Sequence, residues 1–216
     1  MSIKKLFIIF LLLSQKLTPE NQPFTIIIDP LGDPKNTGRE IDDTFERGIT
    51  LQCAEELKKQ LNNTLPDVRV VLTRVPGETI APLQNASFSN RLQADFYLSI
   101  SFYQEPEMPS HISLFYYLDS PTDLWHHYNP LYFYHVSQAH LIHLKDSETM
   151  GKSFLKHLQN SSINSVFIAQ GLFGIPYKPL IGIKAPSLAI EAGLCKKDDW
   201  KYLISPLISC IKAIIS

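Results

Sequence analysis

The sequence has little of several features that mark common classes of protein. Its 3 cysteines in 216 residues are an odd number with no short pairing, which excludes a disulfide scaffold. Only 9 residues are glycine and 44% are hydrophobic, so the chain is neither collagen-like nor disordered. Its 20 basic and 21 acidic side chains leave a formal net charge of -1, with no basic excess for nucleic acid. We expect one compact domain that does not bind nucleic acid.

Long apolar runs are also missing. The apolar run at residues 6–13 is much shorter than the about 20 residues that a membrane-spanning helix needs. It follows two lysines and precedes a polar stretch with prolines, which is the layout of an export signal, although a buried first helix would give a similar run. We predict that residues 1–23 are a signal peptide or, if uncleaved, an N-terminal membrane anchor, and that residues 24–216 form the domain.

From residue 24 onward, strand patterns alternate with helical patterns. In the helical segment 42–61, Phe45, Ile49, Cys53 and Leu57 are spaced by four and would share one face. This alternation predicts an α/β fold: a single domain with a mostly parallel or mixed twisted sheet and helices on both faces. The expected strands are 24–28, 68–72, 96–100, 113–117 and 187–190, and the other expected helices are 87–93, 147–158 and 200–215.

Polar residues follow three of the expected strands directly: Asp29, Ser101 and Glu191. In α/β sheets functional groups gather at the carboxyl ends of strands, so these side chains could converge on one crevice. Glu46 could join them from the first turn of its helix, where the helix dipole alone also favours a carboxylate. Glu191 follows a buried apolar strand, where carboxylates are rare unless they are partnered or used. Glu191 is therefore the strongest candidate for a site residue.

In their order and spacing these segments resemble the N-acetylmuramoyl-L-alanine amidase family, zinc enzymes that cut the bond between the lactyl group of peptidoglycan and its first peptide residue. The strand 26–30 resembles the family's strand ending Asp-Pro-Gly-His-Gly, and Glu46 its glutamate ligand at the start of a helix. Residues 90–100 resemble its Ala-Asn, Ala-Asp, Ser-Ile-His stretch, and 186–193 the segment with its catalytic glutamate, here Glu191. The resemblance covers nearly all of residues 25–216.

The resemblance fails at both zinc-binding histidines, whose positions hold Gly32 and Ser101. The family binds zinc with histidine, glutamate and histidine, and an open position holds the water that attacks the amide. Glu46 is the one ligand left, and a single carboxylate cannot hold zinc against water. Glu191 would then be a proton acceptor with no polarised water to act on. The resemblance thus implies the family fold with a degenerate zinc site and no cofactor.

Two arrangements could supply a substitute zinc site. If Leu31 is an inserted residue, Asp33 aligns with the family's first histidine and could bind a metal beside Glu46. Alternatively, the insertion at about 119–146 contains several histidines, of which His140 and His143 are three apart and would share a helix face. The same insertion could resemble the lid that covers the active site in some relatives.

Two functions follow from these alternatives. The first is a pseudoenzyme, a catalytically impaired amidase-like protein exported to the periplasm or cell envelope that retains binding of peptidoglycan or of an envelope protein. It would touch a membrane only through residues 1–23, if these stay attached. The second is an active metal-dependent amidase that cleaves the lactyl-L-alanine amide of peptidoglycan through a substitute site. A third possibility, an unrelated α/β domain, requires that Asp29, Glu46, Ser101 and Glu191 lie apart.

Overall fold

The computed structural model describes residues 22–215 except 82, 126–128, 130–132 and 161–166. The predicted leader, residues 1–23, thus lies almost entirely outside the described residues, as does the middle of the predicted insertion.

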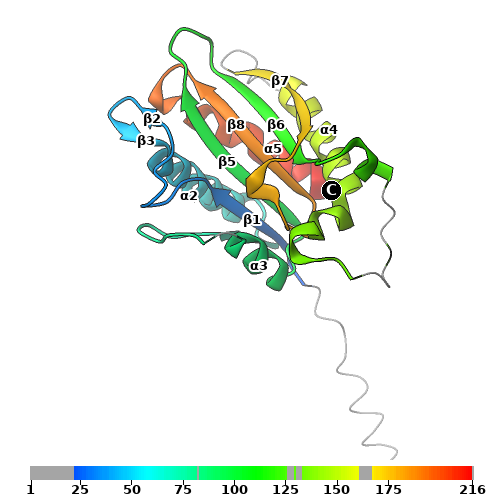
Figure 1. The fold of residues 1–216 in the computed structure, drawn as a ribbon. Helices are drawn as coiled ribbons and strands as arrows, with labels where there is room; N and C mark the ends of the chain where they lie inside the picture. The colour runs from blue at the N-terminus through cyan, green and yellow to red at the C-terminus, as the bar shows by residue number, and fades with distance from the viewer. Residues whose placement is uncertain (1–21, 82, 126–128, 130–132, 161–166, 216) are drawn as a thin grey trace, which may run out of the picture.

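The described chain forms one α/β unit around a six-stranded sheet (Figure 1). The strands are β1 (Phe24–Pro30), β2 (Glu40–Ile41), β3 (Thr44–Phe45), β4 (Val68–Leu72), β5 (Phe96–Gln104), β6 (His111–Tyr117), β7 (Ile168–Ile175) and β8 (Ser187–Leu194). The helices are α2 (Glu46–Thr64), α3 (Gln84–Arg91), α4 (Leu144–Asn160) and α5 (Ile204–Ile215), with 3-10 turns η1 (Pro121–Trp125), η2 (Val136–His143), η4 (Lys178–Leu180) and η5 (Lys197–Leu203).

The sheet is mixed, with the strand order β4-β1-β5-β8-β6-β7. β1, β4, β5 and β8 run parallel to one another, β6 runs antiparallel to β8, and the edge strand β7 is parallel to β6. The carboxyl ends of β5 and β8 meet at the end of the molecule where the small β2–β3 hairpin lies (Figure 1). The predicted fold class, one α/β domain with a mixed sheet, is confirmed.

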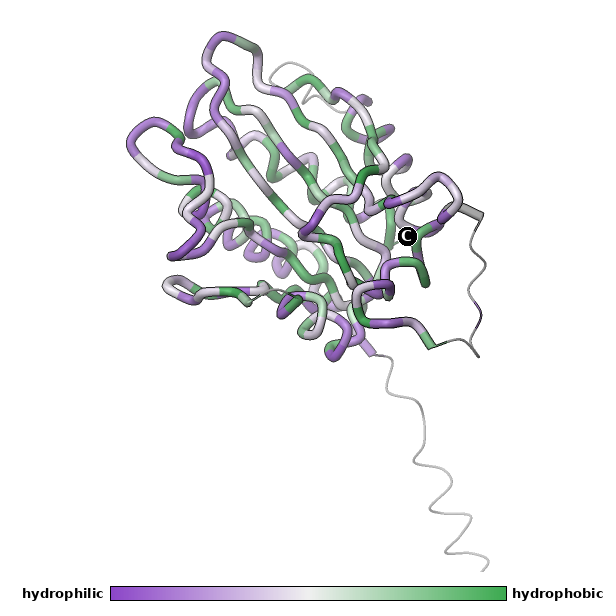
Figure 2. The backbone as a smooth tube through the Cα atoms, viewed as in Figure 1, coloured by the Kyte–Doolittle hydropathy of each residue, from purple (hydrophilic) through white to green (hydrophobic). Residues whose placement is uncertain are grey.

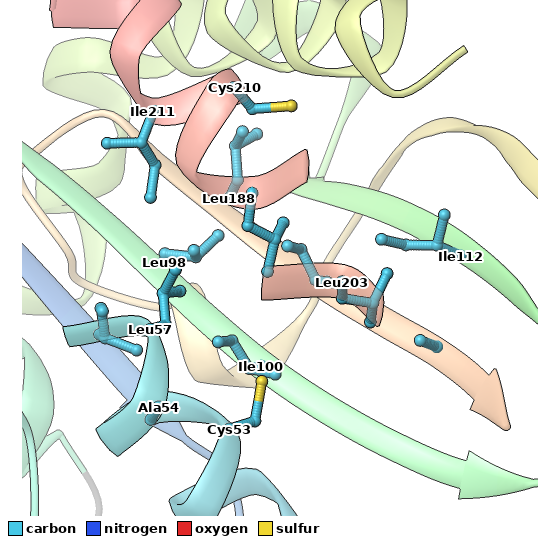
Figure 3. Packing of buried hydrophobic residues seen from close by; sticks show 14 of the residues in the cluster. Cys53, Ala54, Leu57, Leu98, Ile100, Ile112, Leu188, Leu203, Cys210 and Ile211 are labelled. Atoms are coloured by element: carbon cyan, nitrogen blue, oxygen red, sulfur yellow. The ribbon is translucent and has the colours of Figure 1, made fainter. Parts of the chain in front are cut away.

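The larger core lies between the sheet and helices α2, α4 and α5, which cover the same face (Figure 1). Leu57 and Cys53 of α2 point toward Leu98 and Ile100 of β5 (Figure 3). The apolar side chains expected on one helix face, Ile49, Cys53 and Leu57, are all buried, whereas Phe45 precedes the helix and is exposed.

The opposite face of the sheet is covered by α3 and by the chain between β7 and β8. Here Ile27, Tyr97 and Ala189 of the sheet pack with Leu180 and Ile183 in a smaller buried cluster. Hydrophobic residues follow the central strands, and the region around the β2–β3 hairpin is largely hydrophilic (Figure 2). None of the helices in the described part of the chain is long and apolar enough to cross a membrane.

The structure corrects several expected element boundaries. β5 continues to Gln104 and β8 to Leu194, so Ser101 and Glu191 lie within strands and not beyond their ends. The predicted helix over 42–61 begins later, at Glu46, because the preceding residues form the β2–β3 hairpin. The edge strand β7 was not predicted at all.

Candidate functional site at the carboxyl end of the sheet

Glu46 lies beside the part of β5 that extends beyond the end of its neighbour β1. β1 ends at Pro30, opposite Ile100, so the next backbone N–H groups of β5 have no strand beside them on that side. The Oε1 atom of Glu46 accepts a hydrogen bond from the N–H of Phe102 at 3.0 Å. Its Oε2 atom accepts another from the N–H of Arg39 at 3.1 Å. The Glu46 side chain is therefore buried with both oxygens bound to backbone donors.

Ser101 and Glu191 are direct partners in the parallel pair β5–β8 and therefore project from the same face of the sheet. The buried Ser101 hydroxyl donates to the carbonyl of Ile190 at 3.0 Å and lies 3.3 Å from the hydroxyl of Tyr177. The Tyr177 ring stacks on Phe115 of β6, with ring centroids 5.2 Å apart. Ser101 is thus enclosed by a strand carbonyl and a phenol.

Arg39 connects the two carboxylates of this end of the sheet. Its Nη2 donates to Oε1 of Glu191, and its Nε lies 3.8 Å from Oε2 of Glu46. The guanidinium also lies over the ring of Tyr103, 5.0 Å from its centroid. Burial lowers the pKa of Arg39, but the hydrogen bond to Glu191 and the charges of Glu191 and Glu46 outweigh it, so the pKa is raised. Arg39 is a permanent cation between Glu46 and Glu191.

Asp29, by contrast, is part of a buried hydrogen-bond network at the end of β1. Its carboxylate accepts from the hydroxyls of Thr73 at 2.7 Å and Ser99 at 3.2 Å, and from the amide of Asn85 at 2.9 Å. Burial raises the pKa of Asp29, and the hydrogen bonds from Thr73 and Ser99 oppose that shift. Asp29 is on the same face as Ser101 but is occupied in joining β1 to its neighbours.

The loop after β1 is fixed by Arg74 and leaves no room for a side chain at Gly32. The Nε of Arg74 donates to the carbonyl of Pro30 at 3.0 Å, and its Nη2 to the carbonyl of Arg47 at 2.8 Å. Gly32 has a φ of +86°, and a Cβ there would lie 2.8 Å from the Cβ of Arg47. This position therefore suits glycine and not histidine.

Asp33, the expected substitute ligand, binds its own loop. Its Oδ1 accepts from the backbone N–H groups of Lys35 at 2.7 Å and Asn36 at 2.8 Å, and Oδ2 accepts from the Asn36 amide at 3.2 Å. The hydrogen bond from the Asn36 backbone is the main reason why the pKa of Asp33 falls to about 2. The carboxylate thus stabilises a turn and is not joined to Glu46.

The described histidines of the insertion lie at the other end of the sheet. His140 packs against Tyr117 at the end of β6, with ring centroids 4.1 Å apart and the ring planes tilted by 48°, and His143 binds Asp146 at 2.7 Å. β6 is antiparallel to β8, so its last residue is near the start of β8, away from Glu191. The two histidines within 126–128 lie outside the described residues. Among the described residues, no group of three or more His, Cys, Asp or Glu could hold a metal ion.

The sequence matches the profile of the family described as N-acetylmuramoyl-L-alanine amidase over residues 26–215, which is most of the chain. The chain belongs to the N-acetylmuramoyl-L-alanine amidase family. A curated relative, N-acetylmuramoyl-L-alanine amidase CwlM of Bacillus licheniformis, is 35% identical over 75 residues. That match spans 35% of this chain and 30% of the length of the relative.

Solved structures of amidases share the fold. The catalytic domain of CwlV from Bacillus (Paenibacillus) polymyxa var. colistinus aligns with a TM-score of 0.64 at 14% identity, covering 88% of this chain and 97% of that one. AmiC2 of Nostoc punctiforme aligns with a TM-score of 0.65 at 14% identity, covering 89% and 97%. CwlD of Clostridioides difficile, solved in complex with the GerS lipoprotein, aligns with a TM-score of 0.64 at 15% identity, covering 88% and 98%.

The described residues of this amidase-family member do not fit the zinc ion that the family resemblance implies. Gly32 has no donor atom, the Ser101 hydroxyl is hydrogen-bonded to a strand carbonyl, and both oxygens of Glu46 bind backbone N–H groups. A tetrahedral zinc site needs three protein ligands with nitrogen, sulfur or oxygen donors directed at one point. We therefore assign no chemistry to a metal at this position.

The structure brings Glu46, Ser101 and Glu191 together, and places Gly32 in the adjoining loop. Sequence reasoning missed Arg39 and Tyr177, which complete the site. Tyr177 follows β7, which was not predicted, and Arg39 lies in a loop with no periodic pattern. A usable signal was the pair Gly38-Arg39 shortly before Glu46, since glycine permits close approach to a neighbouring side chain.

Proposed function

We propose that this protein is a noncatalytic member of the amidase family, exported to the periplasm or cell envelope, where it binds peptidoglycan without cleaving it. The observation that carries the proposal is the position of Arg39. Its guanidinium lies between Glu46, which corresponds to the glutamate ligand in the resemblance, and Glu191, which corresponds to the catalytic glutamate.

Amide hydrolysis of this type needs a strong Lewis acid and an activated water molecule. Zinc lowers the pKa of its bound water to about 7 and polarises the carbonyl group that is attacked. A guanidinium group donates hydrogen bonds but has no empty orbital for a water oxygen or a carbonyl oxygen. With Arg39 on Glu191 and no imidazole at positions 32 and 101, the site lacks the parts that the reaction needs.

The same face keeps features that suit binding of a glycan strand with attached peptides. Tyr103 and Tyr177 are half-buried beside Arg39 and Glu191, and aromatic faces pack well on sugar rings. Burial raises the pKa of Tyr177, the Ser101 hydrogen bond opposes this, and the Glu191 charge adds to it, so its hydroxyl stays protonated at neutral pH. Neutral hydroxyls and the ion pairs of Arg39 with Glu46 and Glu191 are groups that can bind polar, uncharged sugars.

Export rests on the layout of residues 1–23, which we propose to be a signal peptide or an uncleaved anchor. Residues 24–216, which include the insertion at about 119–146, are then the domain that reaches the envelope. The complex of CwlD with a lipoprotein supports an envelope protein as the other class of ligand for this fold.

The proposal is tested on the purified full-length chain by metal analysis and by incubation with intact peptidoglycan sacculi. We expect less than stoichiometric zinc, no release of peptide, and co-sedimentation of the protein with the sacculi. Glu191→Gln should weaken co-sedimentation, because it removes the partner of Arg39 at the proposed binding face. Glu148→Gln is the matched control, since Glu148 binds Lys145 and Lys152 on α4, far from this end of the sheet.

An active amidase with a substitute metal site predicts a different set of results. Stoichiometric zinc in the native protein, together with peptide release that Glu191→Gln abolishes and Glu148→Gln preserves, would refute the noncatalytic function. A protein that neither cleaves nor sediments with sacculi would refute peptidoglycan binding and leave an envelope protein as the ligand to be sought.

A further inference from the structure

Arg39 is held in place by its backbone as well as by its side chain. Its N–H donates to Oε2 of Glu46, and its carbonyl accepts from the N–H of Glu46 at 2.8 Å. The preceding residue, Gly38, has a φ of +75°, and a Cβ there would lie 2.5 Å from Oε2 of Glu46. The loop thus packs directly on the Glu46 carboxylate and places the Arg39 side chain across that carboxylate.

The Arg39 side chain has contacts on three sides. Glu46 and Glu191 lie at its nitrogen atoms, and its guanidinium carbon lies over the ring of Tyr103. Its side chain is 46% exposed, whereas those of Glu46 and Glu191 are 6% and 24% exposed. Water stabilises the charges of Glu46 and Glu191 less than it stabilises the charge of Arg39. The two carboxylates therefore depend on the Arg39 cation more than Arg39 depends on them.

We propose that Arg39 is the resident cation of this site and occupies, from within the chain, the place between the two glutamates that a metal ion would otherwise take. This inference rests on the noncatalytic function proposed above and extends it to the chemistry of the site. The carboxylate pair is shaped for a planar organic cation of the guanidinium class. A divalent ion that binds between the two glutamates must displace Arg39.

The site should accordingly accept a free guanidinium ion when its own is removed. Arg39→Ala leaves Glu46 and Glu191 without a counter-charge, and we expect its melting temperature to fall by about 2–4 °C, as for other single ion-pair losses in domains of this size. Millimolar methylguanidinium should restore at least half of that loss in a saturable manner and should leave the wild-type melting temperature unchanged. Lys197→Ala is the control, because Lys197 also pairs with a carboxylate near this end, Asp43, but has no second acidic partner in the salt bridges described.

The charge of Glu191 gives a second, independent measurement. In the wild-type chain Glu191→Gln removes a partner of Arg39 and should lower the melting temperature. In the Arg39→Ala background the same substitution removes an uncompensated carboxylate and should raise it. If Arg39 only fills space, the effect of Glu191→Gln on the melting temperature should not reverse its sign. The effect can be measured even if Arg39→Ala unfolds too readily for a titration with methylguanidinium.

The inference is overturned if Arg39→Ala melts like the wild type, if methylguanidinium acts equally on Arg39→Ala and Lys197→Ala, or if Glu191→Gln has the same sign in both backgrounds. These failures differ from a failure of the proposed function. Stoichiometric zinc in the native chain would contradict the noncatalytic function first. If the native chain is metal-free and methylguanidinium does not stabilise the Arg39→Ala variant, only the role of Arg39 is contradicted.

Discussion

Gly32, which the resemblance aligns with the family's first histidine, has no room for a side chain. Its φ of +86° is in the left-handed region, where a side chain on an L-residue costs about 1–2 kcal/mol. The Cβ of Arg47 lies 2.8 Å from the place where a Cβ of residue 32 would be. Because the loop backbone has adapted to glycine, restoring histidine here would require a new loop conformation as well as a new side chain.

The packing at Gly32 can be separated from its backbone strain by comparing two glycines. Gly77 has a similar φ of +84°, but apart from its two chain neighbours no described residue has an atom within 4 Å of the place that its Cβ would take, so alanine there meets only the backbone cost. We expect Gly77→Ala to lower the free energy of unfolding by about 1 kcal/mol, and Gly32→Ala by roughly 1–3 kcal/mol more. Urea denaturation measures both values. Equal losses would show that the contact with Arg47 relaxes freely.

At the residue scale the sequence predicted that Glu46 and Glu191 converge, but it also included Asp29, and it did not predict what lies between the carboxylates. Glu46, Ser101 and Glu191 could be brought together because each is fixed by a strand or by the first turn of a helix. Arg39 could not, because its position follows from a loop whose conformation depends on Gly38 and on the Glu46 carboxylate itself. Loop geometry of this kind has no periodic signal in a sequence.

At the scale of elements, the loop between β1 and α2 is held by side-chain acceptors. Asp33 binds two backbone N–H groups at its start, and Glu46 binds another at its end. α2 begins without a side-chain cap, and loop carbonyls accept its first two N–H groups. The loop and the helix therefore stabilise each other, and weakening one acceptor should weaken the whole segment.

Asp33 should make the stability of this segment depend on pH. Its folded pKa of about 2 lies below the ordinary 3.8, so the charged form stabilises the fold. That contribution is complete above about pH 4 and is lost as the pH falls from about 4 to 2. Asp33→Asn should lower the free energy of unfolding by about 1 kcal/mol at pH 6, allowing for solvent screening. The difference should shrink toward pH 2, as denaturation at several pH values can measure.

Asp67→Asn, in the exposed turn between α2 and β4, is the control for this experiment. A stability difference between the wild type and Asp33→Asn that is the same at pH 6 and pH 2 would contradict the role of the Asp33 charge. It would assign the effect to the shape of the side chain instead.

The alternation of strands and helices was predictable because their apolar patterns are strong. The boundaries of β4 were predicted as observed, whereas β5 and β8 were expected to end at residues 100 and 190, directly before Ser101 and Glu191, and in fact continue beyond them. β7 was missed because it is an edge strand, half-exposed and interrupted by Gly171 and Gly174. A strand with only one neighbour and one covered face carries little of the pattern by which strands are recognised.

At the scale of the whole molecule, the three cysteines show which parts of the core are closed to solvent. Cys53 of α2 points toward Ile100 of the sheet (Figure 3), whereas Cys210 of α5 is buried against α4, with its Sγ 3.7 Å from the carbonyl of Phe154. Burial raises the pKa of Cys210 to about 12 and that of Cys53 higher still. Cys195 follows β8 and is half-buried, with its Sγ 3.6 Å from the carbonyl of Pro106.

Thiol labelling should therefore distinguish the native fold from partly or fully unfolded protein. At pH 8 we expect one thiol, that of Cys195, to react promptly with Ellman's reagent, and all 3 cysteines to react after denaturation. Cys195→Ser should abolish the prompt reaction and leave the two slow ones. Prompt reaction of two or three thiols in the native chain would contradict the packing of α2 and α5 against the sheet.

The reversed direction of β6 sets how far the insertion is from Glu191. β6 carries the chain back to the starting edge of β8, and the described part of 119–146 begins there, next to Tyr117. Glu191 lies four residues after Ser187, the first residue of β8, so at about 3.3 Å per residue roughly 13 Å of strand separates it from that edge. Changes to the turns next to Tyr117 should therefore leave the contacts of Arg39 intact, because the two regions sit at different levels along the same strands.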